Sequence, residues 1–179
     1  MVTPISHPLD ARAILYVLNQ HQVSYVIVGG YGAVLHGSPM ATRDLNITPS
    51  RLVENLQRLA AALTELGARI RIDDDTDGVE STFSAASIGD QFPQMANLRT
   101  PFGDLDLTFA PAGPAGTPFT YERLAERAVT VAIPEPVPVA ALDDIIASKE
   151  AANRPKDRLT LGLLYELRDE VARRAGGTV

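Results

Sequence analysis

The sequence of 179 residues contains no cysteine, so disulfide bonds and thiolate metal sites are excluded. This absence is compatible with a reducing compartment, and we expect the protein to be cytoplasmic. No apolar run approaches the length of a membrane span. The start also lacks the charged segment and apolar core of a secretory signal, so we expect no membrane partner.

An excess of positive charge is also missing. The formal net charge is −6 and the pI is about 5.0. This balance argues against a protein that binds nucleic acid over a broad basic surface. Arginines and lysines do gather late in the chain, but acidic residues lie among them, so solvated helix faces are the favoured interpretation.

The hydrophobic pattern predicts an α/β (α+β) fold, with a small mixed sheet flanked by helices in residues 1–138. A C-terminal helical subdomain at 139–179 is expected to pack on this core as one compact unit. Helices are predicted after Asp10 and at 50–66, where Leu52, Leu56, Leu59 and Leu63 face inward. Short strands are predicted at 69–72, 94–99, 104–109 and 128–133. The acidic run 73–77 should form a solvated turn, 111–118 a loop and 134–138 an extended connector.

A double glycine follows the first predicted strand. The run Tyr25-Val-Ile-Val is apolar and β-branched, as in a strand buried on both faces, and it ends at Gly29. Gly29 and Gly30 allow a tight turn that exposes backbone N–H groups, and a helix starting there would direct its positive end to the same point. The pattern fits a phosphate site or an ordinary strand-to-helix turn.

Acidic residues alternate along two later strands. Asp44, Asn46 and Thr48 share one strand face, and the pattern Asp104-Leu-Asp106-Leu repeats it further along the chain. If the strands are neighbours, Asp44 and Asp106 lie on one wall near Asn46. Oxygen ligands of this kind suit Mg²⁺, with substrate phosphates completing its shell. An exposed acidic strand face is the alternative for either strand alone.

The order of these motifs resembles the nucleotidyltransferase superfamily, in which Gly-Gly, a short spacer and Asp-x-Asp precede a lone Asp on a later strand. The wider pattern is similar to the AbiEii/MenT-like toxin nucleotidyltransferase branch. It comprises His36-Gly37-x-Pro39-x-Ala41-Thr42-Arg43-Asp44 and a tail with Lys149 followed by Arg154-Pro-Lys156-Asp157. The resemblance extends from about residue 20 to residue 165.

The resemblance implies a role for each motif residue. Gly29 and Gly30 would hold a triphosphate through backbone N–H groups. Asp44, Asp106 and position 46 would bind Mg²⁺ in a two-metal site, and Asp106 would also activate the incoming hydroxyl. Lys149 would neutralise phosphate charge, and Asp157 would orient Lys149 or the nucleotide.

Three further basic residues belong to the motifs. The resemblance places Arg43, Arg154 and Lys156 among the nucleotide-binding residues. Strand alternation, however, puts Arg43 on the face opposite Asp44, which favours a structural anchor there.

Asn46 departs from the resemblance, since the superfamily carries a second aspartate at this position. An amide keeps one carbonyl oxygen but loses the negative charge and the second ligand oxygen. Metal affinity should fall, because two-metal transfer relies on carboxylates that bridge the cations. Natural attenuation, loss of catalysis and deliberate inactivation all fit this substitution. Met40 is a second departure, where the family often has arginine.

Lys149 lies on the apolar stripe of a predicted helix, with Leu142, Ile145 and Ile146. Pro155 suits the first turn of a following helix, which carries Asp157 inward. The two side chains should therefore meet near one helix–helix junction. They form either a structural salt bridge or a pair facing a cleft.

The sequence thus predicts an enzyme that transfers a nucleoside monophosphate from an NTP to a hydroxyl. The resemblance makes the 3′ end of tRNA the expected acceptor and a cognate antitoxin the expected protein partner. A small molecule or a protein side chain is an alternative acceptor. A catalytically inert nucleotide-binding or partner-binding module is the alternative of another class.

Overall fold

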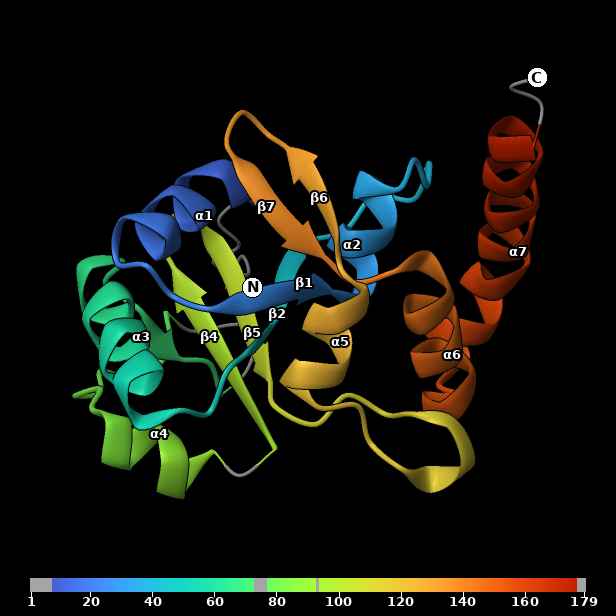
Figure 1. Ribbon diagram of the computed structural model, residues 1–179. Coiled ribbons are helices and arrows are strands. Elements are labelled where there is room, and N and C mark those ends of the chain that lie inside the picture. Colours follow the sequence, from blue (N-terminus) through green and yellow to red (C-terminus); the bar gives the residue numbers. More distant parts are fainter. Residues whose placement is uncertain (1–7, 73–76, 93, 177–179) are drawn as a thin grey trace, which may run out of the picture.

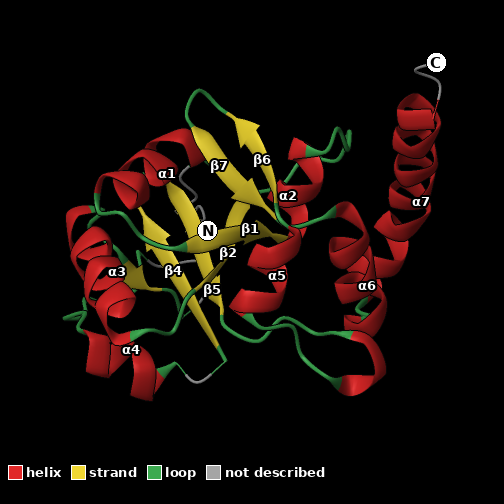
Figure 2. Cartoon of the chain, in the orientation of Figure 1, coloured by secondary structure: helices red, strands yellow, loops and turns green. Residues whose placement is uncertain are grey.

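The computed structural model describes residues 8–72, 77–92 and 94–176. Within these ranges it is a mixed α/β protein built on one seven-stranded sheet of order β3-β4-β5-β2-β1-β7-β6 (Figures 1 and 2). The strands are β1 (Tyr25–Val28), β2 (Asp44–Pro49), β3 (Arg69–Ile70), β4 (Met95–Thr100), β5 (Gly103–Thr108), β6 (Val129–Ala132) and β7 (Pro136–Val139). The predicted fold class is therefore confirmed.

The helices of the described residues cover both faces of this sheet. They are α1 (Ala11–Gln20), α2 (Gly29–Leu35), α3 (Val53–Glu65), α4 (Ala85–Gln91), α5 (Tyr121–Arg127), α6 (Leu142–Ala152) and α7 (Pro155–Gly176), with the short 3-10 helix η1 (Pro114–Gly116). Helices α1, α3 and α4 lie on one side in Figure 1, and α5, α6 and α7 on the other. None of these helices is both long and apolar enough to cross a membrane.

The central strand β1 shows how the two faces arise from the sequence. All four of its residues are buried, as the continuous apolar run predicts. Tyr25 and Ile27 belong to the core cluster that includes α1 and α3, whereas Val26 and Val28 belong to the cluster with α5, α6 and α7. Because successive strand residues point to opposite faces, one short strand joins both halves of the core.

The first two predicted helices are present, with one corrected boundary. Asp10 caps α1 by accepting a hydrogen bond from the backbone N–H of Ala13 at 3.1 Å. Helix α3 begins at Val53, so Leu52 precedes it and is 68% exposed instead of facing inward. Its inner face still buries Leu56, Leu59 and Leu63.

Several other elements differ from the sequence prediction. Strand β3 has only two residues, and β7 replaces the extended connector predicted at 134–138. In β7, Val139 pairs with Ile27 of β1, whereas Pro136 and Pro138 pair with β6, so neither proline occupies the β1 pairing position. The 3-10 helix η1 lies in the predicted loop 111–118.

Two elements of the prediction remain open. The boundary expected between residues 138 and 139 falls inside β7, and the division into a core and a helical subdomain stays a prediction. The acidic turn predicted at 73–77 lies, except for Asp77, outside the described residues.

Candidate active site

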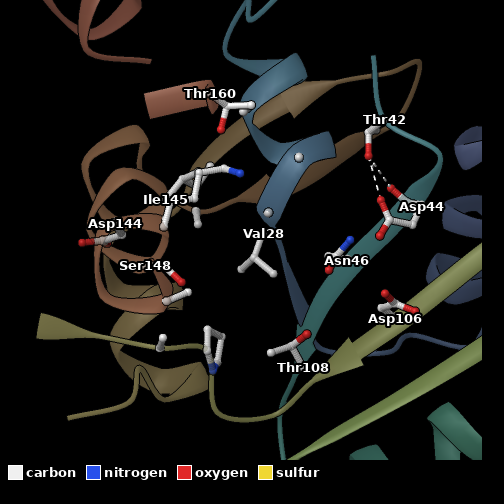
Figure 3. A pocket seen from close by; sticks show the side chains of 18 of the residues that line it. Val28, Thr42, Asp44, Asn46, Asp106, Thr108, Asp144, Ile145, Ser148 and Thr160 are labelled. Atoms are coloured by element: carbon white, nitrogen blue, oxygen red, sulfur yellow. Dashed lines mark hydrogen bonds between the residues drawn. The ribbon is translucent and has the colours of Figure 1, made fainter. Parts of the chain in front are cut away.

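A cavity of about 490 Å³ opens between the centre of the sheet and the helices α2, α6 and α7. Figure 3 shows Asp44, Asn46 and Asp106 on one side of it and Ile145 and Ser148 of α6 on the other. Its lining also includes the start of α2, the segment 110–112 and basic residues of α6 and α7. The cavity therefore gathers residues from most of the length of the chain.

The acidic wall of the cavity comes from two parallel strands. In the register of β2 and β5, Asp44 lies opposite Asp104 and Asn46 opposite Asp106. Side chains two residues apart on a strand share a face, so Asp44, Asn46 and Asp106 project together. The predicted wall, with both carboxylates beside the amide, is confirmed.

The double glycine lies directly beside this wall. Gly29 has a φ of +65°, and a β-carbon there would stand 3.2 Å from both Cβ and Cγ of Asn46. A β-carbon on Gly30 would meet Thr42 Oγ1 at 3.0 Å. Gly29 also has the left-handed conformation that favours glycine, and at both positions the absence of a β-carbon lets the first turn of α2 lie close to Thr42 and Asn46. Helix α2 has only seven residues, so its N-terminus alone does not make an anion site. An anion here would be bound by the backbone N–H groups of the turn together with the basic side chains of the cavity.

Asp44 is stabilised in its ionised form. Thr42 Oγ1 donates a hydrogen bond to Asp44 Oδ1 at 2.7 Å (Figure 3). Burial by itself raises the pKa of Asp44, but the hydrogen bonds from Thr42 and Asn46 and the charges of Lys156 and Arg71 lower it overall. Asp44 is therefore a carboxylate at neutral pH.

Asp106 behaves differently although it lies beside Asp44. Burial raises the pKa of Asp106 to about 7, and the negative charges of Asp44 and Asp104 add to this effect. Arg71 opposes the rise by donating a hydrogen bond from Nη2 to Asp106 Oδ1 at 3.0 Å. The site therefore combines one firmly ionised carboxylate with one that exchanges a proton readily.

Arg71, Asp104 and Arg99 form a charged network behind Asp106, which the sequence did not reveal. Arg71 also donates to Asp104 Oδ2, and Arg99 Nε donates to Asp104 Oδ1 at 3.0 Å. Arg99 and Asp104 are cross-strand neighbours on β4 and β5, so their pairing was predictable once these strands were aligned. Arg71 has no such signal, because it follows the short strand β3 and belongs to no motif.

The opposite wall of the cavity is basic. Lys149, Arg154, Lys156 and Thr160 line it from α6, the α6–α7 turn and α7. Asp157 does not line it: its side chain is fully buried and binds Lys149 Nζ at 3.2 Å and Arg154 Nε at 2.6 Å. The predicted salt bridge between Lys149 and Asp157 is therefore present, and of this pair only Lys149 lines the cavity.

The structure brings together most of the predicted site residues. Those that line the one cavity are Gly29, Gly30, Asp44, Asn46, Asp106, Lys149, Arg154 and Lys156. Asp157 contacts this set from behind. Arg43 is exposed and outside the lining, as the strand alternation indicated, so the structure gives no support for a contact between Arg43 and a nucleotide.

Asp157 leads to a prediction about stability. Replacing Asp157 by asparagine should destabilise the fold by about 1–3 kcal/mol at pH 7, because Lys149 and Arg154 lose a charged acceptor. Hydrogen bonds from Arg154 and Lys149 outweigh burial and lower the pKa of Asp157, so this stabilisation is present at neutral pH and disappears as pH falls through the folded pKa. Urea unfolding of both proteins at pH 7 and at an acidic pH below the folded pKa of Asp157 measures it. A difference that persists unchanged in acid would contradict the ionic role.

The donor set of the acidic wall fits one hard cation. Mg²⁺ is commonly bound by one or two carboxylates, with phosphate and water oxygens completing an octahedral shell. Asp44 and Asp106 provide the carboxylates, and Asn46 adds an amide oxygen. In the described ranges, no group of three or more His, Cys, Asp or Glu side chains could hold a metal ion, so a closed all-protein cage is not formed there.

Comparisons with known proteins identify the fold. No protein-family model matches the sequence, and no curated protein matches it. The solved structure of the lincosamide antibiotic adenylyltransferase LnuA with bound lincomycin is similar, with a TM-score of 0.58 and 16% identity over 88% of this chain and 95% of that one. ANT(2″)-Ia in complex with adenylyl-2″-tobramycin has a TM-score of 0.52 and 17% identity, covering 92% and 96% of the two chains.

These neighbours define the class of structure to which the chain conforms. It has the nucleotidyltransferase fold, with a site of carboxylates and cations arranged around a glycine turn. The superfamily resemblance drawn from the motifs is thus supported at the level of fold. The narrower resemblance to the AbiEii/MenT branch stays a prediction.

Proposed function

We propose that this protein is a nucleotidyltransferase that moves a nucleoside monophosphate from an NTP to an acceptor hydroxyl. The observation that carries the proposal is the pair of oppositely charged walls in one cavity. Asp44 and Asp106 line it together with Lys149, Arg154 and Lys156, and the Gly29–Gly30 turn lies beside the acidic side. A triphosphate with its cation requires both signs of charge at close quarters.

The triphosphate would lie between the glycine turn and the basic wall. Backbone N–H groups of Gly29 and Gly30 can donate to phosphate oxygens without obstruction by a side chain. Lys149 is 15% exposed and fixed by Asp157, so its ammonium is held in place before a ligand arrives. The apolar side of the cavity, formed by Val28, Ile145 and their neighbours, is suited to the nucleoside.

The transfer itself is a displacement at the α-phosphorus. The acceptor oxygen forms a bond to that phosphorus, the bond to the bridging oxygen breaks, and pyrophosphate leaves with its electron pair. Asp106 accepts the proton of the hydroxyl, and Asp44 and Asp106, with the amide of Asn46, would hold Mg²⁺. When bound, the cation neutralises charge on the phosphates and stabilises the oxygens that attack and leave.

The acceptor is the least constrained part of the proposal. The AbiEii/MenT-like motifs support transfer to the 3′ end of tRNA by a toxin with a cognate antitoxin. A small-molecule hydroxyl is a second candidate, favoured by the fold neighbours whose names describe them as antibiotic adenylyltransferases. Asn46 keeps the inert nucleotide-binding module as the third.

A transfer assay separates these candidates. The protein is incubated with Mg²⁺ and each α-labelled NTP, together with either tRNA, a lincosamide and an aminoglycoside, or a bacterial protein extract. Label on tRNA supports the toxin activity, and label on an antibiotic supports the second candidate. If NTP binds but neither this chain nor its Asn46→Asp variant transfers label to any acceptor, the enzymatic proposal is overturned and the inert module is favoured.

A further inference from the structure

The strongest unassigned feature is the arginine that reaches the acidic wall from outside the motifs. Arg71 bridges two carboxylates of β5, with Nη1 on Asp104 Oδ2 and Nη2 on Asp106 Oδ1. Its side chain is 19% exposed, and its backbone N–H is fixed to the carbonyl of Asn97 at 2.9 Å. The guanidinium is therefore a positioned charge behind Asp106, outside the cavity lining, and not a mobile surface group.

The network behind Arg71 keeps it in this place. Asp104 accepts hydrogen bonds from both Arg71 and Arg99, and the Arg99 side chain is only 5% exposed. A two-pronged arginine between two carboxylates has a defined orientation that a lysine ammonium cannot reproduce. In the register of β2 and β5, Asp104 lies opposite Asp44 and Asp106 lies opposite Asn46. Arg71 therefore binds both carboxylates of β5 that lie next to this part of β2.

The absence of charge at position 46 makes the contact between Arg71 and Asp106 important for the electrostatics of the site. Asp44 and Asp106 carry the acidic charge that faces a ligand, and the amide of Asn46 adds an oxygen without a charge. Arg71 then binds one oxygen of Asp106. With an uncharged amide at position 46 and a guanidinium bound to Asp106, the acidic wall presents less negative charge to a divalent cation than its carboxylates alone would.

We propose that Arg71 is a positioning residue of the active site, which orients Asp106 and reduces the negative charge that the acidic wall presents to a divalent cation. This inference rests on the proposed function, because it assumes that Asp44 and Asp106 bind a divalent ion.

Mn²⁺ binding to the nucleotide-free protein tests this role without relying on turnover. Arg71→Met should bind Mn²⁺ about tenfold more tightly than the wild type, because a competing cation leaves Asp106. Arg71→Lys should keep the weaker affinity because it keeps the charge, and both variants should lose at least about tenfold in transfer rate, since neither positions Asp106. Titration followed by electron paramagnetic resonance gives the affinity and the number of bound ions.

The matched control is Arg69→Met, two residues away, where the arginine binds Glu80 at 3.1 Å instead of the carboxylates of β5. It should leave Mn²⁺ affinity and transfer unchanged. Equal Mn²⁺ affinity in the wild type and Arg71→Met, with both folded by thermal melting, would overturn the role of Arg71 alone. Absence of Mn²⁺ binding in both would contradict the proposed metal site and the role of Arg71 with it. If Arg71→Met fails to fold, Arg71→Lys decides: a tenfold gain in affinity despite the retained charge would also overturn the proposal.

Discussion

Replacing Asp106 by asparagine should reduce nucleotidyl transfer by about 10³-fold or more. The change removes the proposed proton acceptor, and general base catalysis alone contributes about 10²–10⁴-fold. It also removes one of the two carboxylates offered to the cation. Asp106 is 7% exposed and its carboxylate is hydrogen-bonded to Arg71. Water therefore has little access to this position and cannot easily replace the lost carboxylate.

Initial rates of label transfer under saturating NTP measure this effect. Asp90→Asn is the matched control, because it makes the same chemical change on the exposed surface of α4, away from the cavity. NTP affinity should fall less than the rate, since the glycine turn and the basic wall are intact. A variant that retains more than about a tenth of the wild-type rate would remove Asp106 from the role of base.

The acidic wall and the glycine turn are the parts of this site that the sequence predicts best. The acidic wall follows from period-2 alternation once the register is known: because β2 and β5 pair Asp44 with Asp104 and Asn46 with Asp106, the side chains of Asp44 and Asp106 share a face. The glycine turn follows from the absence of a β-carbon, and the contact between Gly29 and Asn46 shows why none is accommodated. Both features follow from local rules that can be applied to short segments of sequence.

The charged network shows what such rules cannot reach. Arg71 meets Asp106 across 35 residues of chain, through a two-residue strand that pairs with β4. The sequence predicts a strand at 69–72, but it does not show which strand lies beside it, and Arg71 has the same sequence appearance as any surface arginine. Its role depends on tertiary pairing and on the position of β4 next to β5, which no local pattern contains.

The short helices were missed for a related reason. Helices α4 and α5 have seven residues each, too few for a hydrophobic period to be distinguished from chance. Their starts did carry a signal, because Ser84 and Thr120 accept hydrogen bonds from backbone N–H groups three residues later. Capping residues thus locate helices that periodicity overlooks, although α5 also depends on the burial of Leu124 in the core.

Restoring aspartate at position 46 is expected to have the opposite effect to the loss of Asp106. Asparagine and aspartate have nearly the same shape, so Asn46→Asp preserves the close contact with Gly29. It adds a negative charge and a ligand oxygen beside Asp44 and Asp106. Divalent affinity should rise about 10–100-fold, on the scale of changes in the immediate surroundings of metal ligands. Transfer at limiting Mg²⁺ should rise with it.

The gain in cation affinity has to exceed an unfavourable effect on Asp44. The hydrogen bond from the Asn46 amide, which lowers the pKa of Asp44, is lost in the variant. Asn97→Asp separates ligand geometry from added charge. Asn97 lies opposite Asp106 on β4, so it brings the same charge from the other neighbouring strand, outside the cavity lining. Mn²⁺ titration should show tighter binding for Asn46→Asp only. Equal gains in both variants would mean that position 46 acts through charge alone, and weaker binding in Asn46→Asp would show that the site is built around the amide.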